Sequence, residues 1–163
     1  ATEYRWQREI RIEKDGFGGT FDVDLAGGPR YQRHTVVLIK AMNSNINKNI
    51  KNYANTTVGE AARIMYAAPD QTGRRFEQVV FVTLFPRVAP VFRQDGTVAR
   101  LDDVLSAKSR TEIGPVLNAQ YGSRVRLVEI AYDIVGIERL RKQSQFAHVD
   151  VATVSGLEGL AIL

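Results

Sequence analysis

The sequence predicts an α/β fold: a single domain with a mostly parallel central sheet flanked by helices and an N-terminal antiparallel β-hairpin. Apolar runs of strand length recur at 35–42, 78–85 and 124–132. Helical patterns are expected between these runs, and the first residues of the chain alternate apolar and polar side chains instead. Strands that alternate with helices are typical of parallel sheets with helical crossovers.

Length and composition are those of one ordinary globular domain. The 163 residues are 44% hydrophobic and 25% charged, which allows a real core. We expect a single domain over 1–163, with 1–30 as a β-hairpin edge and 31–163 as the α/β core. No apolar run is long enough to span a membrane, and the N-terminus lacks a signal-peptide pattern.

Cysteine and histidine usage limits the chemistry. The chain has no cysteine and two histidines, which excludes disulfides, thiolate ligands and cysteine nucleophiles. It also excludes a zinc site with three histidine ligands. We therefore expect no metal and no cofactor, and a cytoplasmic location is compatible with the missing cysteines. The net charge of +4 favours acidic partners, nucleic acid among them.

The N-terminal residues 4–25 are predicted to form an antiparallel pair of strands. Apolar side chains alternate with polar ones on both sides of the glycine-rich segment 14–19, as in strands with one buried face. This segment lacks the Gly-Lys-Ser/Thr ending of a phosphate-binding loop and does not precede a helix. A hairpin turn is therefore the favoured interpretation.

The run 35–42 is apolar on both faces apart from Lys40, which is typical of a central strand with helices on both sides. The next twelve or so residues are rich in asparagine and are expected to be irregular. A helix is predicted over 58–68, because Thr57 and Glu60 have the capping-box spacing. Pro69 is expected to end it.

The second half continues with a buried strand at 78–85 and a mixed segment at 87–100 that contains a turn at 94–96. One or two helices are expected over 102–120, beginning at Asp102 and Asp103 and interrupted at Gly114-Pro115.

After the third strand at 124–132, the sequence predicts a short helix near 136–145. A last strand is expected at 148–154, and the apolar tail 156–163 is expected to pack against the body.

Four short blocks between residues 35 and 135 resemble a known family. They are Met42-Asn43-Ser44-Asn45, Asn55-Thr56-Thr57-Val58, Val82-Thr83-Leu84-Phe85 and Ala131-Tyr132-Asp133. Their order and spacing are similar to those of a bacterial and phage family called domain of unknown function sixteen-forty-three. Its blocks are Leu-Asn-Pro-Ser, Asp-x-Thr-Val, Val-Asn-Leu-Phe and Ala-Trp-Gly.

Three positions depart from the family pattern. No proline follows Asn43, Thr83 stands in place of an asparagine, and Tyr132-Asp133 replaces the Trp-Gly pair. The resemblance implies a fold and no established activity.

Polar side chains follow each of the three predicted strands. Asn43, Ser44 and Asn45 follow the first, Arg87 the second and Asp133 the third. If the strands are parallel neighbours, these side chains face one crevice at the carboxyl ends, where ligands bind in such sheets. Asn43, Ser44, Asn45 and Arg87 are then candidate substrate-binding residues, and Asp133 is a candidate catalytic base. The alternatives are a solvated asparagine loop and an Arg–Asp pair that ties loops together.

The leading hypothesis is a small domain that binds a nucleotide or nucleic acid at this crevice. One alternative is a hydrolase acting on a base or sugar, so enzymatic activity is left open. Another is a structural, self-assembling protein such as a virion coat subunit, because no strong catalytic motif is present. A homo-oligomer is compatible with each, and no membrane partner is expected.

Overall fold

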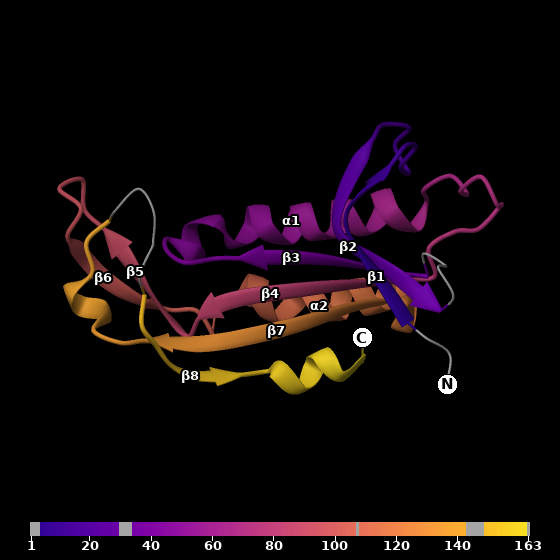
Figure 1. Cartoon of the computed structure of the whole chain (residues 1–163). Coiled ribbons are helices and arrows are strands. Elements are labelled where there is room, and N and C mark those ends of the chain that lie inside the picture. Colours follow the sequence, from indigo (N-terminus) through magenta and orange to yellow (C-terminus); the bar gives the residue numbers. More distant parts are fainter. Residues whose placement is uncertain (1–3, 30–33, 107, 143–148, 163) are drawn as a thin grey trace. The chain divides into compact units, whose positions relative to one another are not determined.

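The computed structural model describes residues 4–29, 34–106, 108–142 and 149–162 (Figure 1). A six-stranded sheet has the order β1-β2-β3-β4-β7-β8, and β5 and β6 form a separate two-stranded sheet. The strands are β1 Tyr4–Ile12, β2 Phe21–Pro29, β3 Thr35–Ala41, β4 Gln78–Pro86, β5 Val88–Phe92, β6 Val98–Asp103, β7 Val125–Ile134 and β8 Val151–Ser155. The helices are α1 Ile46–Met65 and α2 Lys108–Tyr121, with 3-10 turns η1 Gly122–Arg124, η2 Ile137–Arg139 and η3 Leu157–Ile162.

The predicted mostly parallel sheet flanked by helices is wrong. β1 pairs with β2, β2 with β3 and β7 with β8, and all three pairings are antiparallel. Three of the five neighbouring pairs in the main sheet are therefore antiparallel, and the described residues contain two α-helices. The outer strands pair with their neighbours in the chain, as in hairpins, whereas a parallel sheet needs a crossover at every step.

The chain forms two compact units, and five elements (β3, α1, β4, α2 and β7) contribute residues to both. The first unit contains the chain up to Ile39 together with Asn55–Val82 and Ile113–Leu127. The second contains Lys40–Ala54, Thr83–Glu112 and the chain from Val128 onward.

In the first unit, β1 and β2 form the predicted hairpin, with Ile12 opposite Phe21 next to the turn. The turn is fixed by Asp15, whose carboxylate is buried. Asp15 accepts the amides of Phe17 and Gly19 at 2.8 and 3.0 Å and pairs with Arg63 of α1 at 2.5 Å. The glycine-rich segment is therefore a hairpin turn tied to the end of α1.

Position 16 of this turn requires glycine because the backbone there lies against α1. The Gly16 N–H donates to the Arg63 carbonyl at 2.7 Å, and a Cβ here would lie 2.7 Å from the Ala62 carbonyl oxygen. Glycine is needed because the turn approaches the backbone of α1 too closely for a side chain.

α1 begins twelve residues earlier than the sequence predicts. The asparagine-rich segment expected to be irregular is helical from Ile46, and Ile46, Ile50 and Tyr53 are buried. Their spacing of four and three residues places them on one helical face. Burial of that face outweighs the poor helix propensity of asparagine. Thr57, the predicted capping residue, is instead buried in the middle of the helix.

In the second unit, part of the mixed segment forms the β5–β6 hairpin. Val88 lies opposite Asp103 and Phe92 opposite Val98, and Gly96 turns the chain with φ +84. Asp102 and Asp103 are therefore strand residues, and the helix start predicted there is wrong.

α2 begins at Lys108 and continues through Pro115 to Tyr121. The predicted interruption at Gly114-Pro115 is also wrong. Ile113 and Leu117 on either side of the proline are buried, and their packing holds the helix together despite the backbone donor that proline lacks.

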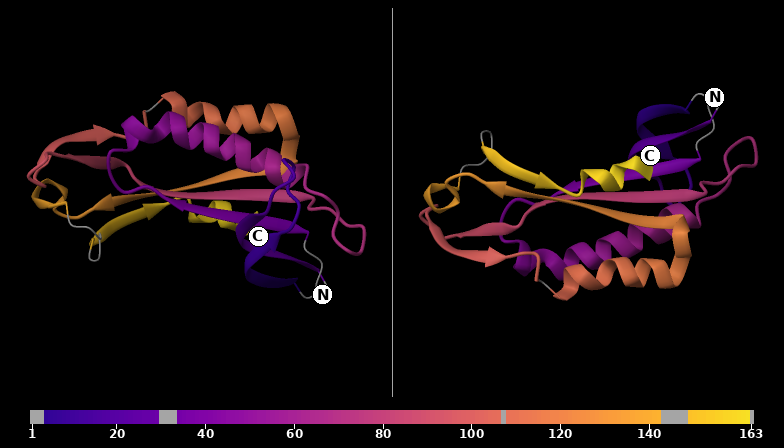
Figure 2. Two further views of the ribbon diagram at one scale, coloured as in Figure 1. Left: turned by 90° about the horizontal axis from the view of Figure 1, so that it is seen from above. Right: turned by 90° about the horizontal axis from the view of Figure 1, so that it is seen from below.

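The predicted helix at 136–145 is absent where the structure describes it, since only η2 forms there, and residues 143–148 lie outside the described ranges. β8 runs antiparallel to β7 (Figure 2), with Tyr132 opposite Val154. A Cβ on Gly159 would meet the Val128 side chain at 2.8 Å, so the apolar tail packs against β7. Within the described ranges, neither helix has the length and apolar character of a membrane span.

Candidate functional site at the strand ends

The carboxyl ends of β3, β4 and β7 lie side by side in the second unit. Met42, which follows β3, donates its N–H to the carbonyl of Leu84 in β4 at 2.8 Å. Arg87, which follows β4, donates its N–H to the carbonyl of Tyr132 in β7 at 2.9 Å. The segments that carry the predicted site residues therefore meet at one edge. We call Asn43, Ser44, Asn45, Arg87, Tyr132 and Asp133 the strand-end cluster.

Arg87 is held by contacts on two strands. Its Nη1 lies 2.9 Å from Oδ2 of Asp133, and its Nη2 donates to Oγ of Ser155 in β8. Nη1 also lies 3.5 Å from the carbonyl oxygen of Thr153. The Arg87 side chain is 21% exposed and that of Asp133 47%. Arg87 thus acts first as a tie between β4, β7 and β8, which is the alternative that the sequence left open.

Asn43 is oriented by Tyr132. The Tyr132 hydroxyl donates to Oδ1 of Asn43 at 3.0 Å, which fixes the amide and leaves Nδ2 as a donor. Burial raises the pKa of Tyr132 above its ordinary value, so the phenol stays protonated and keeps donating well above neutral pH. No described residue accepts a hydrogen bond from Nδ2 of Asn43.

Ser44 and Asn45 form the connection from β3 into α1. Asn45 has φ 51, a left-handed conformation that asparagine tolerates better than most residues. Its N–H donates to Pro90 at 3.2 Å, and its carbonyl accepts Nδ2 of Asn49 at 3.2 Å. The side chains of Ser44 and Asn45 have no hydrogen-bond partner among the described residues.

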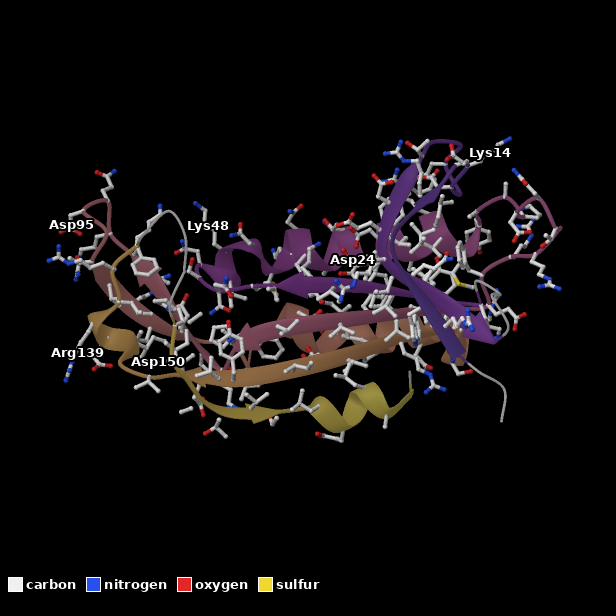
Figure 3. The ribbon with its side chains drawn as sticks, in the orientation of Figure 1. Lys14, Asp24, Lys48, Asp95, Arg139 and Asp150 are labelled. Carbon is white, nitrogen blue, oxygen red and sulfur yellow. The ribbon has the colours of Figure 1, made fainter. Side chains whose placement is uncertain are left out.

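The start of α1 beside this connection favours negative charge. The first turn contains no acidic residue, and Lys48 projects outward from it (Figure 3). The first backbone amides of a helix lack intrahelical acceptors and lie at the positive end of the helix dipole. Anions such as phosphates bind readily there.

Tyr53 was not among the residues predicted to matter in the second unit. The hydroxyl of Tyr53 in α1 hydrogen-bonds to Thr83 in β4, and both side chains are buried. The ammonium of Lys40 lies 5.5 Å from the centre of the Tyr53 ring, a cation–π contact. The spacing of Tyr53 from Ile46 was an available signal, but it becomes visible only once the asparagine-rich segment is treated as helical.

The structure brings together Asn43, Arg87 and Asp133 from three separate strand ends, with Ser44 and Asn45 adjacent in the chain. Their roles in binding or catalysis stay predictions. No three histidine, cysteine, aspartate or glutamate side chains in the described part of the chain are grouped to hold a metal ion.

Comparison of the chain with protein-family models, with curated proteins and with solved structures gives no match. The resemblance carried by the four short blocks therefore stays a prediction.

Proposed function

We propose that the protein binds a nucleotide or a nucleic-acid strand at the strand-end cluster. The observation that carries the proposal is the Tyr132–Asn43 hydrogen bond of 3.0 Å. It holds an amide donor at the carboxyl ends of three strands, where ligands of α/β sheets bind. An oriented asparagine can read the acceptors of a base edge or a sugar hydroxyl.

In this proposal, the phosphate of the ligand binds the backbone amides at the start of α1 and the hydroxyl of Ser44. The helix dipole and Lys48 contribute favourable charge. Arg87 positions Asp133 through their ion pair, and Asp133 offers its remaining carboxylate oxygen to a donor on the ligand. We also propose a cytoplasmic location, because a chain without cysteines needs no oxidising compartment.

The experiment is a fluorescence-anisotropy titration with a labelled single-stranded oligonucleotide and, in competition, with nucleoside phosphates. Asn43→Ala removes the oriented amide and is expected to weaken binding about tenfold or more, the loss of one or two hydrogen bonds. Asn52→Ala is the matched control, because Asn52 is an exposed asparagine of α1 and has no side-chain partner among the described residues.

Equal binding by the Asn43→Ala variant and the parent chain would overturn the assignment. Loss of binding in both asparagine variants would place the ligand elsewhere on α1. Circular dichroism of each variant separates loss of binding from loss of folding.

We propose self-assembly as a second candidate function, because β8 is exposed. β8 is the last strand in the sheet order and carries no charged residue. Val151, Val154 and Leu157, in β8 and just after it, are 46, 45 and 53% exposed. An uncharged, exposed edge strand is a template for pairing with another chain.

Size-exclusion chromatography with light scattering tests self-assembly, with the 260/280 nm absorbance ratio reporting packaged nucleic acid. Val154→Lys should convert an assembling protein to monomer, and a monomeric parent chain at all concentrations would remove this candidate.

A further inference from the structure

We propose that a pocket in the first unit binds a small phosphorylated molecule with a flat apolar part, such as a nucleoside monophosphate. The pocket lies between the end of β1 and the loop that follows α1, and it has a volume of about 530 Å³. Ligand pockets of proteins commonly have volumes of about 300–1,000 Å³. We call it the arginine pocket. Its lining includes Arg11, Ile12, Lys14, Arg74, Arg75 and Phe76.

Positive charge exceeds negative charge around this pocket. Four cationic side chains line it, against the carboxylates of Glu13 and Asp70. The Asp70 carboxylate is already engaged, since its Oδ1 accepts the amide and hydroxyl of Thr72 at 2.8 and 2.7 Å and the amide of Arg74 at 3.0 Å. It is therefore not free to form close ion pairs with all of the cations that line the pocket.

The cations differ in how far they are engaged. Arg11 pairs with Asp22 at 2.9 Å, and Arg75 donates to the Ala67 carbonyl at 3.0 Å. The described residues provide no hydrogen-bond acceptor for the side chains of Lys14 and Arg74. These two are the groups available to an anion, and Figure 3 shows Lys14 near the tip of the hairpin. A guanidinium and an ammonium together match a phosphate dianion.

The loop that presents Arg74 is ordered by its own hydrogen bonds. Asp70 donates its N–H to the Arg74 carbonyl at 2.8 Å, and Gly73 donates its N–H to the Asp70 carbonyl at 2.9 Å. Gly73 has φ +78, a conformation that glycine adopts without strain. A fixed loop lowers the entropy that the protein loses when a ligand binds.

An apolar surface lies beside the cations. Ile12 is buried, and Phe76, which also lines the pocket, is half-buried. Arg74 interacts electrostatically with Asp70, but neither Arg74 nor Lys14 has a side-chain hydrogen-bond acceptor among the described residues. An aromatic ring in the same pocket as these two cations suits a ligand that joins a flat ring system to a phosphate, since bases stack on aromatic side chains. Inorganic phosphate alone would leave this surface unused.

Calorimetric titration with adenosine monophosphate, adenosine and inorganic phosphate tests the proposal on the full chain. We expect the monophosphate to bind more tightly than either fragment. In the Asn43→Ala background, which lacks the strand-end amide, the double variant Lys14→Ala/Arg74→Ala should weaken it at least tenfold. Arg139→Ala is the matched control, because the Arg139 side chain is 88% exposed and does not line the pocket.

Asn43→Ala separates this site from the strand-end cluster. Monophosphate binding that survives Asn43→Ala and is lost when Lys14→Ala/Arg74→Ala is added supports the arginine pocket, whatever the outcome at the strand ends. No binding by the Asn43→Ala chain, or binding that the added pocket substitutions leave unchanged, overturns it. If inorganic phosphate binds as tightly as the monophosphate, the apolar surface does not contribute to binding of the ligand.

Discussion

The arginine pocket and the strand-end cluster both contain basic side chains, but two of the four cations in the pocket have no hydrogen-bond acceptor in the described part of the chain, whereas the arginine of the cluster has several. At the strand ends, Arg87 is engaged by Asp133 and Ser155. In the pocket, Lys14 and Arg74 have no hydrogen-bond acceptor within the described ranges. A cation with protein partners contributes to stability, whereas a cation without them is available for a ligand. We therefore expect the strand-end cluster to bind its ligand through Asn43 and the backbone amides of α1. We expect the arginine pocket to bind its ligand through the charges of Lys14 and Arg74.

The largest expected effect concerns the anchoring of the strand-end cluster. Ile46, the first residue of α1, is 1% exposed, and Ile46→Ala should lower the free energy of unfolding by about 2–5 kcal/mol. Urea denaturation measures it, with Asn52→Ala as the control that changes stability by less than about 0.5 kcal/mol. An equally small effect of Ile46→Ala would mean that burial does not hold the start of α1.

Replacing one arginine of each region with alanine tests most directly whether the two arginines differ in their contribution to stability. Arg87→Ala removes hydrogen bonds to a charged group, so it should lower the free energy of unfolding by about 1.5–3 kcal/mol. Arg74→Ala should change it by less than about 0.5 kcal/mol. Urea titrations of both variants check this, and equal losses of stability would contradict the distinction between engaged and available cations.

The convergence at the strand ends could be predicted from the sequence. The three apolar runs are strands, and Asn43 and Arg87 follow β3 and β4 as predicted. Asp133 lies inside β7, which continues two residues beyond the predicted end at 132. The pairing of Arg87 with Asp133 was one of the alternatives that the sequence left open, but the contact with Ser155 could not be predicted, because Ser155 belongs to β8 and is 68 residues away in the chain. Its contact depends on β8 returning antiparallel along β7, which no local pattern indicates.

The low helix propensity of asparagine led to a wrong prediction for the start of α1, where burial of apolar side chains stabilises the helix. Asparagine disfavours a helix, yet Ile46, Ile50 and Tyr53 bury one face of α1, and that pattern was present in the sequence. The arginine pocket could not be found in the same way, since it joins β1 to a loop about sixty residues later.

A smaller effect concerns the ion pair of Asp15 with Arg63 in the first unit. Burial alone raises the pKa of Asp15, but hydrogen bonds from Arg63 and from the amides of Phe17 and Gly19 outweigh it and lower the pKa below its ordinary value. The stabilisation is therefore present above the unfolded pKa of about 3.9. It is lost as the pH falls through the lower folded pKa.

Asp15→Asn should accordingly lower the thermal midpoint at neutral pH, and the difference from the parent chain should shrink as the pH falls below about 4. Thermal melts followed by circular dichroism between pH 2 and 7 measure this. A difference that stays constant down to pH 2 would exclude the charged form of Asp15 as its source.

The smallest effect on stability concerns the hydroxyl that orients Asn43. Tyr132→Phe removes one hydrogen bond and should lower the free energy of unfolding by about 0.5–1.5 kcal/mol. It should also weaken oligonucleotide binding several-fold, because the Asn43 amide is then free to rotate. Unchanged anisotropy titrations would show that the orientation of Asn43 does not matter for binding.

The most direct test of the strand-end proposal is a two-dimensional ¹H–¹⁵N NMR titration with adenosine monophosphate. It reports both regions in one experiment. We expect the amides of Asn43, Ser44, Asn45 and the first turn of α1 to shift on binding, together with a separate set around Lys14 and Arg74. Saturating ligand that leaves the amides from Asn43 to Lys48 unmoved would contradict the proposed nucleotide site, whatever happens in the arginine pocket.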